Sequence, residues 1–215
     1  MYHYEYASRK FRKPIRDKIV ELLNQVQKDL KQEFTFQFKF EGSDPLNLVT
    51  YDTKTNTGFD FDINVYPNDD EQKYSAKELK TMFINSFNKF GKKYCFDYCE
   101  NSSRVITLKV IDSKHSKILY SCDIAIVHDY WDNDDEWHQQ LVYFNKRQNS
   151  YYWQEQPAPF YEFYDRVDAI KEHGFWQEVR DLYLEKKNNN NDINKKSRSL
   201  RIEAVNEVYQ RHFEL

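Results

Sequence analysis

Three acidic residues stand at positions where they could hold divalent cations. Asp60 and Asp62 are two residues apart in the run Phe59-Asp-Phe-Asp-Ile-Asn-Val65, which alternates between apolar and polar side chains as a β-strand does. Side chains two apart on a strand point to the same face, so these carboxylates can share a cation pair. Asp123 lies in a second apolar run. If the two strands pair, we expect the three acids to hold two magnesium or manganese ions about 4 Å apart, an arrangement that serves phosphoryl transfer.

A single Asp-x-Asp pair is more often the water-facing side of a half-exposed sheet than a metal site, so a second feature is needed. That feature is Gly42-Ser43, which follows the strictly alternating run 34–40 and is separated from Asp60 by sixteen residues. A glycine lets the backbone approach a phosphate, and a serine hydroxyl with nearby amide N–H groups can hold phosphate oxygens. Gly42-Ser43 is therefore the candidate phosphate-binding turn.

The order of these features resembles that of the nucleotidyltransferase superfamily, whose members share the polymerase-β-like fold. Gly42-Ser43, Asp60-Phe-Asp62-Ile63 and the apolar-flanked Asp123 match its pattern of Gly-Ser, Asp-x-Asp and a later third acid. The resemblance covers about residues 35–130. The spacing between the two motifs is more similar to that of oligoadenylate synthetases and bacterial cGAS/DncV-like enzymes than to that of the small antibiotic-modifying enzymes. One departure is that Leu48-Val-Thr50 stands where a Gly-Thr often follows the Gly-Ser.

This resemblance implies a fold, an activity and a role for each residue. The fold is α+β, a mixed β-sheet flanked by helices with a C-terminal helical annex. The activity is metal-dependent transfer of a nucleoside monophosphate from a nucleoside triphosphate such as ATP to an acceptor hydroxyl, and nucleotide second-messenger synthesis is one form of it. Gly42 and Ser43 would bind the β- and γ-phosphates. Asp60 and Asp62 would bind the nucleotide-side metal, and Asp123 would bind the second metal and help to deprotonate the acceptor.

Further patterns predict the elements that must position these residues. Apolar residues recur at helical spacing from Ile15 to about Gln32, after a basic, aromatic arm at 1–13 and with Pro14 in the first turn. Ser75 followed by Glu78 has the spacing of a capping box and predicts a helix over 75–90. Strands are expected at 34–40, 59–65, 104–111 and 117–127, with a short hairpin at 141–144 and 151–153.

A change of pattern near Pro157 predicts two domains. Strand-like alternation ends after Trp153, and helical spacing follows, so we expect a catalytic domain at 1–157 and a helical annex at 158–215. The polar run 186–192 predicts an exposed loop within this annex. Some basic side chains of the annex could reach a triphosphate, although solvated loop charge is the simpler interpretation of each. They are Lys186, Lys187, Lys195, Lys196, Arg198 and Arg201.

Length and composition exclude several classes of protein. The chain has 215 residues with only four Gly and five Pro, which excludes collagen-like, low-complexity and disordered chains. Its 32 basic and 35 acidic residues give a net charge of −3, so nucleic-acid binding has no support from global charge. No secretory signal or long apolar run is visible, and we expect a cytoplasmic protein without a membrane partner.

Two other groups of potential ligands are interpreted as structural. Cys95, Cys99 and Cys122 are expected to be buried or half-buried thiols, because no partner has the spacing of a zinc site. His128-Asp129-Tyr130 and the acidic run at 131–136 predict a solvated surface loop.

Two alternative functions stay open. A metal-dependent nuclease also uses clustered acids on a sheet, and Asp60, Asp62, Glu100 and Lys109 loosely imitate that arrangement. A non-catalytic interaction module, such as an antitoxin or a scaffold, could keep the fold with a degenerate site. The Gly-Ser before Asp-x-Asp favours transfer over cleavage, and the three intact acids count against the module.

Overall fold

The structure, a computed structural model, describes residues 3–55, 58–69, 73–157, 161–192 and 194–214. The chain divides into two compact units. The sheet unit comprises residues 7–49 and 56–158, and the helical unit comprises residues 1–6, 50–55 and 159–215. The expected domain boundary after residue 157 stays a prediction, and residue 158 lies outside the described residues.

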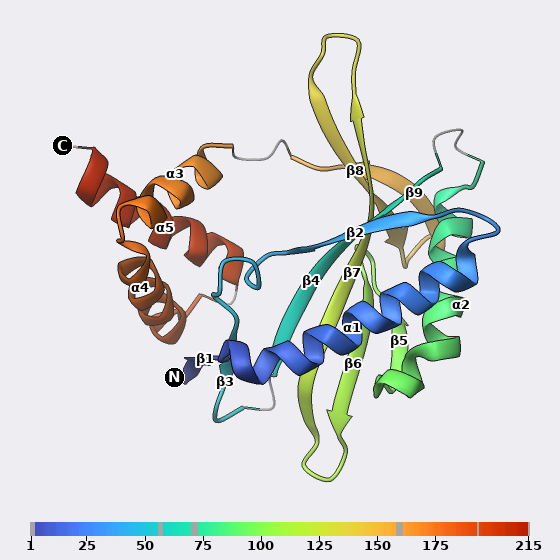
Figure 1. Cartoon of the computed structure of the whole chain (residues 1–215), viewed down its shortest axis with the longest axis horizontal. Coiled ribbons are helices and arrows are strands. Elements are labelled where there is room, and N and C mark those ends of the chain that lie inside the picture. Colours follow the sequence, from blue (N-terminus) through green and yellow to red (C-terminus); the bar gives the residue numbers. More distant parts are fainter. Residues whose placement is uncertain (1–2, 56–57, 70–72, 158–160, 193, 215) are drawn as a thin grey trace. The chain divides into compact units, whose positions relative to one another are not determined.

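A mixed β-sheet forms the centre of the sheet unit (Figure 1). Its described strands are β2 (Phe36–Glu41), β4 (Phe59–Pro67), β5 (Tyr98–Asn101), β6 (Ile106–Asp112), β7 (Lys117–Trp131), β8 (Trp137–Asn145) and β9 (Ser150–Glu155). They follow the order β2-β4-β7-β6-β5, and β8 and β9 continue from the far end of β7. β4 and β7 are parallel, and the other described pairs in this sheet are antiparallel. With its helices, this sheet confirms the predicted α+β class.

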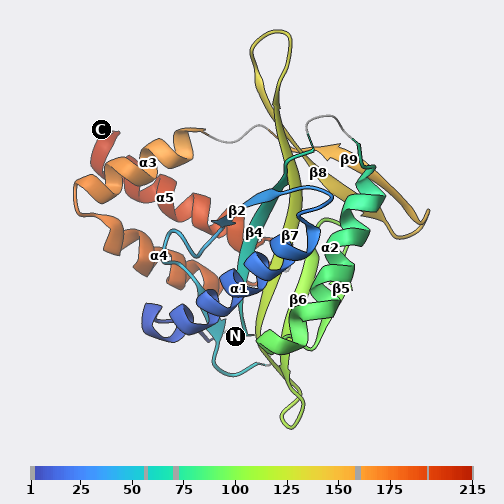
Figure 2. The ribbon, with the colours of Figure 1, turned by 45° about the vertical axis from the view of Figure 1, so that its right-hand side comes forward.

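The apolar face of the sheet packs against two helices, α1 (Arg9–Leu30) and α2 (Ala76–Phe90), as Figure 2 shows. The ring centroids of Phe36 on β2 and Phe83 on α2 are 5.1 Å apart. Alternate side chains of β4 and β7 are nearly inaccessible on this face: Phe59, Phe61, Ile63, Val65, Cys122, Ile124 and Ile126. Each large apolar side chain buried there stabilises the fold by about 1.5–3 kcal/mol. The intervening polar residues must therefore lie on the opposite face.

The two helices differ in how closely they match the sequence prediction. α2 begins as predicted, because the Ser75 hydroxyl accepts from the Glu78 N–H and the Glu78 carboxylate accepts from the Ser75 N–H at 2.8 Å. The predicted start of α1 at Pro14 is wrong. Ser8 caps a helix that begins at Arg9, and its hydroxyl accepts from Phe11 N at 3.2 Å. Pro14 lies in the second turn, where it removes one backbone hydrogen bond without ending the helix.

The helical unit contains α3 (Tyr161–Glu172), α4 (Trp176–Asn189) and α5 (Ser197–Phe213), with a short two-stranded sheet of β1 (Tyr4–Tyr6) and β3 (Thr50–Asp52). The expectation of an exposed loop at 186–192 is wrong for its first four residues. They extend α4, because the Lys187 side chain is buried and its Nζ donates to Thr50 Oγ1 at 2.7 Å. None of the described helices is long and apolar enough to span a membrane.

The capping box of α2 gives a first testable prediction. Ser75→Ala removes the oxygen that accepts from the Glu78 N–H, and we expect the free energy of unfolding to fall by about 1 kcal/mol. Chemical denaturation would measure this change. Ser113→Ala is the matched control, because Ser113 is exposed in a turn and its replacement should cost less than about 0.5 kcal/mol. Equal losses in both variants would contradict the capping role.

Candidate active site

The parallel pairing of β4 with β7 brings the three candidate acids together. Their register sets Asp62 opposite Asp123 and Asp60 opposite Ser121, on the face away from α1 and α2. Each of the three acids offers a carboxylate oxygen, and these oxygens all lie within 4.8 Å of one another. The structure thus joins residues from two distant segments, and their role as metal ligands stays a prediction.

Crowding and burial change the acidity of this group. The pKa of Asp60 is raised from an ordinary 3.8 to about 8, chiefly because burial penalises the charged form, with the charges of Asp123 and Asp62 adding to the effect. Burial also raises the pKa of Asp123, and a hydrogen bond from Thr107 opposes this rise. Asp60 therefore holds a proton at neutral pH unless a positive charge comes close to it.

A divalent cation fits this donor set. Magnesium and manganese prefer hard carboxylate oxygens, and three acids this close provide several of them. A cation among them would compensate the mutual repulsion and favour the charged form of Asp60. The observation that supports the fit is the closeness of the three acids, whose carboxylate oxygens all lie within 4.8 Å of one another.

Two hydroxyl groups orient the carboxylates, and the sequence analysis missed both. Ser121 Oγ donates to Asp60 Oδ1 at 2.8 Å, and Thr107 Oγ1 on β6 donates to Asp123 Oδ1 at 2.6 Å. Ser121 lies two residues before Asp123, so its position on the same face was readable once the strand was assigned. Thr107 was not readable, because only the antiparallel register of β6 and β7 sets it opposite Asp123.

Gly42 lies against the acids at the end of β2. Its φ is +69°, a left-handed conformation that favours glycine. A Cβ at this position would overlap Asp62 Oδ2, so the close approach of the Gly42 backbone to the carboxylate requires the absence of a side chain. The pairing of Glu41 with Asp62 sets this approach. The turn that begins at Gly42 therefore stands beside one of the three acids, and phosphate binding itself stays a prediction.

Glu100 and Lys109, which the nuclease alternative requires, share the polar face of the sheet. Lys109 Nζ lies 2.6 Å from Glu100 Oε2, and this ion pair is half-buried. Among the described residues of this face, the acids grouped within 4.8 Å of one another are Asp60, Asp62 and Asp123, and Glu100 is outside that group. The arrangement thus supports the three-acid site rather than one built on Glu100.

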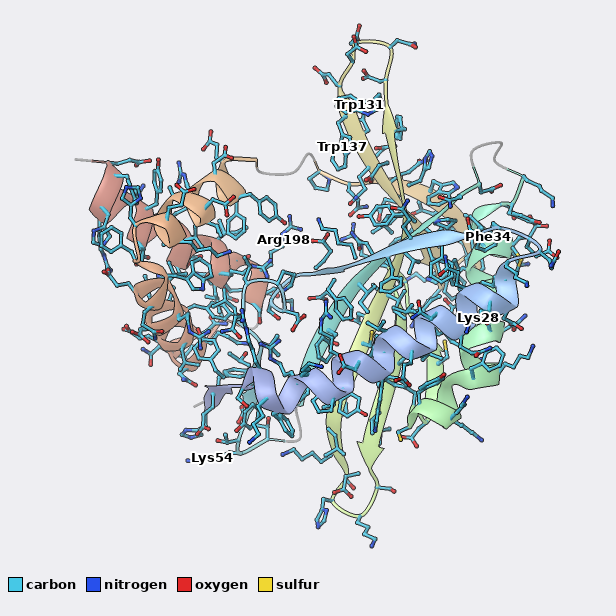
Figure 3. All side chains as sticks on the ribbon, viewed as in Figure 1. Lys28, Phe34, Lys54, Trp131, Trp137 and Arg198 are labelled. Atoms are coloured by element: carbon cyan, nitrogen blue, oxygen red, sulfur yellow. The ribbon has the colours of Figure 1, made fainter. Side chains whose placement is uncertain are left out.

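The expected surface loop at 128–136 is strand in its first four residues. His128 to Trp131 belong to β7 and pair with β8, leaving a turn at 132–136, and Figure 3 shows Trp131 and Trp137 on the two strands of this hairpin. His138 joins Asp132 and Glu136 in a second close group of potential ligands. The Asp132 carboxylate already accepts from the N–H groups of residues 134 and 136 and contacts His138 Nε2 at 2.8 Å, so it organises the turn.

The structure also shows the burial of the three cysteines and the ion pairs of two lysines in the helical unit. Cys122 is buried and Cys99 is half-buried as expected, whereas Cys95 is exposed and contradicts the expectation. Lys186 contacts Glu207 at 2.5 Å and Lys195 contacts Glu203 at 2.8 Å, within the helical unit. These pairs agree with the simpler interpretation of these two lysines as part of a charged surface.

Comparisons with solved structures identify the fold. The chain is similar to a CdnE cyclic dinucleotide synthase of Elizabethkingia meningoseptica, with a TM-score of 0.55, 10% identity and coverage of 93% of this chain and 70% of that chain. It is similar to a STING-associated CdnE c-di-GMP synthase of Capnocytophaga granulosa, with a TM-score of 0.55, 18% identity and coverage of 95% and 64%. It is also similar to the Vibrio cholerae di-nucleotide cyclase DncV, solved with GTP, with a TM-score of 0.58, 14% identity and coverage of 94% and 55%.

The chain has the fold of the cGAS/DncV-like nucleotidyltransferases. The resemblance drawn from the Gly-Ser turn and the three acids predicted this nucleotidyltransferase fold, and the prediction is confirmed. The chain spans 55–70% of the length of these solved structures. No family model matches the sequence, and no curated protein sequence matches it. At such low identities the similarity establishes the nucleotidyltransferase fold alone.

The acidity of Asp60 predicts how stability depends on pH in the absence of divalent cations. Its pKa is about 8 in the folded protein but close to the ordinary 3.8 in the unfolded chain. Across that range the folded state holds a proton that the unfolded state releases, so stability falls as pH rises. In EDTA, we expect the melting temperature of the wild type to fall more between about pH 6 and about pH 8.5 than that of Asp60→Asn.

Asp134→Asn is the matched control for this experiment, because Asp134 is exposed in the hairpin turn. Its melting temperature should follow the wild type at both pH values. A difference of 1 kcal/mol corresponds to about 2–4 °C for a chain of this size. Parallel pH profiles for the wild type and Asp60→Asn would show that Asp60 is not protonated in the folded state.

Metal binding gives a second prediction at this site. Magnesium or manganese with a nucleoside triphosphate should raise the melting temperature of the wild type more than that of Asp62→Asn, because the variant loses one charged ligand. A ligand at 100 times its Kd stabilises the folded state by about 2.7 kcal/mol, which is well within measurement. Differential scanning fluorimetry of both proteins, each titrated with the metal and the nucleoside triphosphate, would measure the two shifts. Equal shifts in both proteins would exclude Asp62 as a ligand.

Proposed function

We propose that the chain is a metal-dependent nucleotidyltransferase that transfers a nucleoside monophosphate from a nucleoside triphosphate to an acceptor hydroxyl. One observation carries this proposal: three acids on parallel strands offer carboxylate oxygens within 4.8 Å of one another, with the Gly42 backbone packed against one of them. Triphosphate binding needs both parts, because cations must compensate the phosphate charge and a tight turn must approach the phosphates. The fold similarity to cyclic dinucleotide synthases supports the same activity.

Each residue has a role in this reaction. The Gly42-Ser43 turn binds the β- and γ-phosphates, with the Ser43 hydroxyl as a hydrogen-bond donor. Asp60 and Asp62 would hold the nucleotide-side cation, and Asp123 would hold the second cation, near the acceptor. The bound cations supply charge compensation at the α-phosphate and at the pyrophosphate that leaves. Ser121 and Thr107 keep Asp60 and Asp123 in the required orientation through their hydrogen bonds.

The transfer step is an in-line displacement at the α-phosphorus. The acceptor oxygen forms a bond to phosphorus while the bond from phosphorus to the bridging oxygen breaks, and pyrophosphate departs with that electron pair. The proton of the acceptor hydroxyl passes to the Asp123 carboxylate.

A second nucleotide is the acceptor that the comparisons favour. The solved structures with this fold are named as cyclic dinucleotide synthases, and the Vibrio cholerae cyclase was solved with GTP and with a linear dinucleotide intermediate. We therefore propose nucleotide second-messenger synthesis as the specific form of the activity. This chain spans only 53–70% of those chains, so the number of transfer steps that it catalyses is part of the proposal.

A product screen tests the activity and the acceptor together. Purified protein is incubated with each labelled nucleoside triphosphate, singly and in pairs, with magnesium or manganese, and every product is identified by mass spectrometry. Linear or cyclic dinucleotides would support the proposal, whereas a modified protein would name a different acceptor. Shortened nucleic acid in a parallel assay would favour the nuclease. Inertness under all conditions would favour the non-catalytic module.

Two substitutions should separate the effect on turnover from the effect on nucleotide affinity. Asp123→Asn keeps the shape and the Thr107 hydrogen bond but removes charge and basicity, so we expect turnover to fall by about 10²–10⁴-fold with nucleotide affinity largely retained. Ser43→Ala removes one phosphate hydrogen bond worth about 1–2 kcal/mol, so affinity should fall by roughly 5- to 30-fold. Turnover assays and nucleotide titrations on both variants measure the two effects.

Asp134→Asn serves again as the control, because the exposed Asp134 side chain lies in the hairpin turn and not among the three acids. Its turnover and its nucleotide affinity should both match the wild type. Full activity in Asp123→Asn would reject the nucleotidyltransferase mechanism itself, since no other step in it supplies the base.

A further inference from the structure

The segment that follows β2 is tied to helix α1 by a buried arginine. Arg12 is 4% exposed although guanidinium groups are almost always at the surface. Its Nε donates to the Ala7 carbonyl at 3.0 Å, one terminal nitrogen pairs with Asp44 Oδ1, and the other donates to Asn47 Oδ1 at 2.7 Å. One side chain thus connects the start of α1 to both ends of the segment 44–47.

A second arginine completes the environment of Asp44. Arg16 Nε lies 3.2 Å from Asp44 Oδ2, and its guanidinium carbon lies 3.9 Å above the ring of Phe40, the residue two before Gly42. Both oxygens of the Asp44 carboxylate are therefore paired with arginine. The Asp44 side chain is only 8% exposed, so water contributes little to its stabilisation.

The backbone of this segment depends on the same contacts. Two hydrogen bonds close the turn, from Asn47 N to the Asp44 carbonyl at 3.0 Å and from Leu48 N to the Ser43 carbonyl at 2.9 Å. Asn47 has a φ of +56°, which is uncommon outside glycine and is stabilised here by its side-chain bond to Arg12. The conformation of the segment after Ser43 is thus set by side-chain contacts with α1.

We propose that Arg12 is a positioning residue for the phosphate-binding turn, an inference that rests on the proposed function. Asp44 follows Ser43 directly, so its negative charge stands next to the place where a triphosphate would bind. An unpaired carboxylate there would repel the phosphates and would also be costly to bury. Arg12 removes both effects by neutralising Asp44 and by fixing the turn that carries Ser43, while Arg16 neutralises the second oxygen.

This role predicts that a substitution of Arg12 weakens the binding of ligands that carry β- and γ-phosphates. Arg12→Gln should weaken binding of the triphosphate by about tenfold, because the charge of Asp44 is then only partly compensated, and binding of the corresponding monophosphate should change by less than about twofold. The probes are the monophosphate and the methylene analogue of the triphosphate in which carbon replaces the oxygen between the α- and β-phosphates. The base is that of the substrate found in the product screen, and isothermal titration with magnesium measures both affinities.

A matched control separates positioning from general destabilisation. Arg166 is also a partly buried arginine, which donates to Asn206 at 3.0 Å and to Glu162 at 3.2 Å within the helical unit. Arg166→Gln should lower the melting temperature and leave the ratio of triphosphate to monophosphate affinity unchanged. If Arg12→Gln lowers the melting temperature alone, as the control does, the positioning role is wrong.

Two further variants keep the test decisive if Arg12→Gln does not fold. Arg12→Gln combined with Asp44→Asn removes both charges and should bring the triphosphate affinity to within about threefold of the wild type. Asn47→Gly tolerates the positive φ but removes the acceptor of Arg12, and it should weaken triphosphate binding about threefold with little effect on the monophosphate. Two results together would overturn the proposal. They are an unchanged ratio of triphosphate to monophosphate affinity in Asn47→Gly and a tenfold loss of triphosphate affinity in the double variant.

The wild type distinguishes this inference from the proposed function. If the wild type binds the triphosphate analogue no more tightly than the monophosphate, the proposed function fails and Arg12 has no phosphate turn to position. If the wild type prefers the analogue and Arg12→Gln keeps the full preference, only the inference about Arg12 fails.

Discussion

The close approach of three acids on β4 and β7 is the constraint on which the rest of the sheet unit depends. Asp60, Asp62 and Asp123 lie within 4.8 Å of one another, and burial raises the pKa of Asp60 to about 8. Such a group opposes folding, so another part of the unit must hold it in place. The opposite face of the same two strands supplies that stabilisation, because its aromatic and aliphatic side chains are almost completely buried beneath α1 and α2.

The difference between local patterns and contacts across the sheet explains how much of the structure could be predicted from the sequence. The alternation in β4, the capping box at Ser75 and the Gly-Ser turn are local patterns, and the structure contains an element at each of them. Asp60 and Asp62 could be chosen because Asp-x-Asp fixes their spacing within one strand, and Asp123 could be chosen because it matches the third acid of the family pattern. A local pattern depends only on neighbours in the sequence, so the sequence is sufficient to predict it.

The features that were missed depend on contacts between distant segments. Thr107 reaches Asp123 only through the register of β6 and β7, and Lys187 is buried only because its amino group meets Thr50. The burial of Arg12 belongs to the same class, since its side chain connects Ala7 with the segment after Ser43. In each case a polar or charged residue is buried with a partner that sequence periodicity does not indicate.

The register of β4 against β7 requires more than the apolar pattern. A slip by one residue would turn every apolar side chain to the wrong face, but a slip by two would keep the faces aligned and still separate Asp62 from Asp123. Gly58 lies so close to β7 that a Cβ would overlap the backbone carbonyls of Ile118 and Leu119. A slip that set Asp60 at this place would force its side chain into the β7 backbone. Gly58 therefore excludes that register, in which Asp62 would no longer lie opposite Asp123.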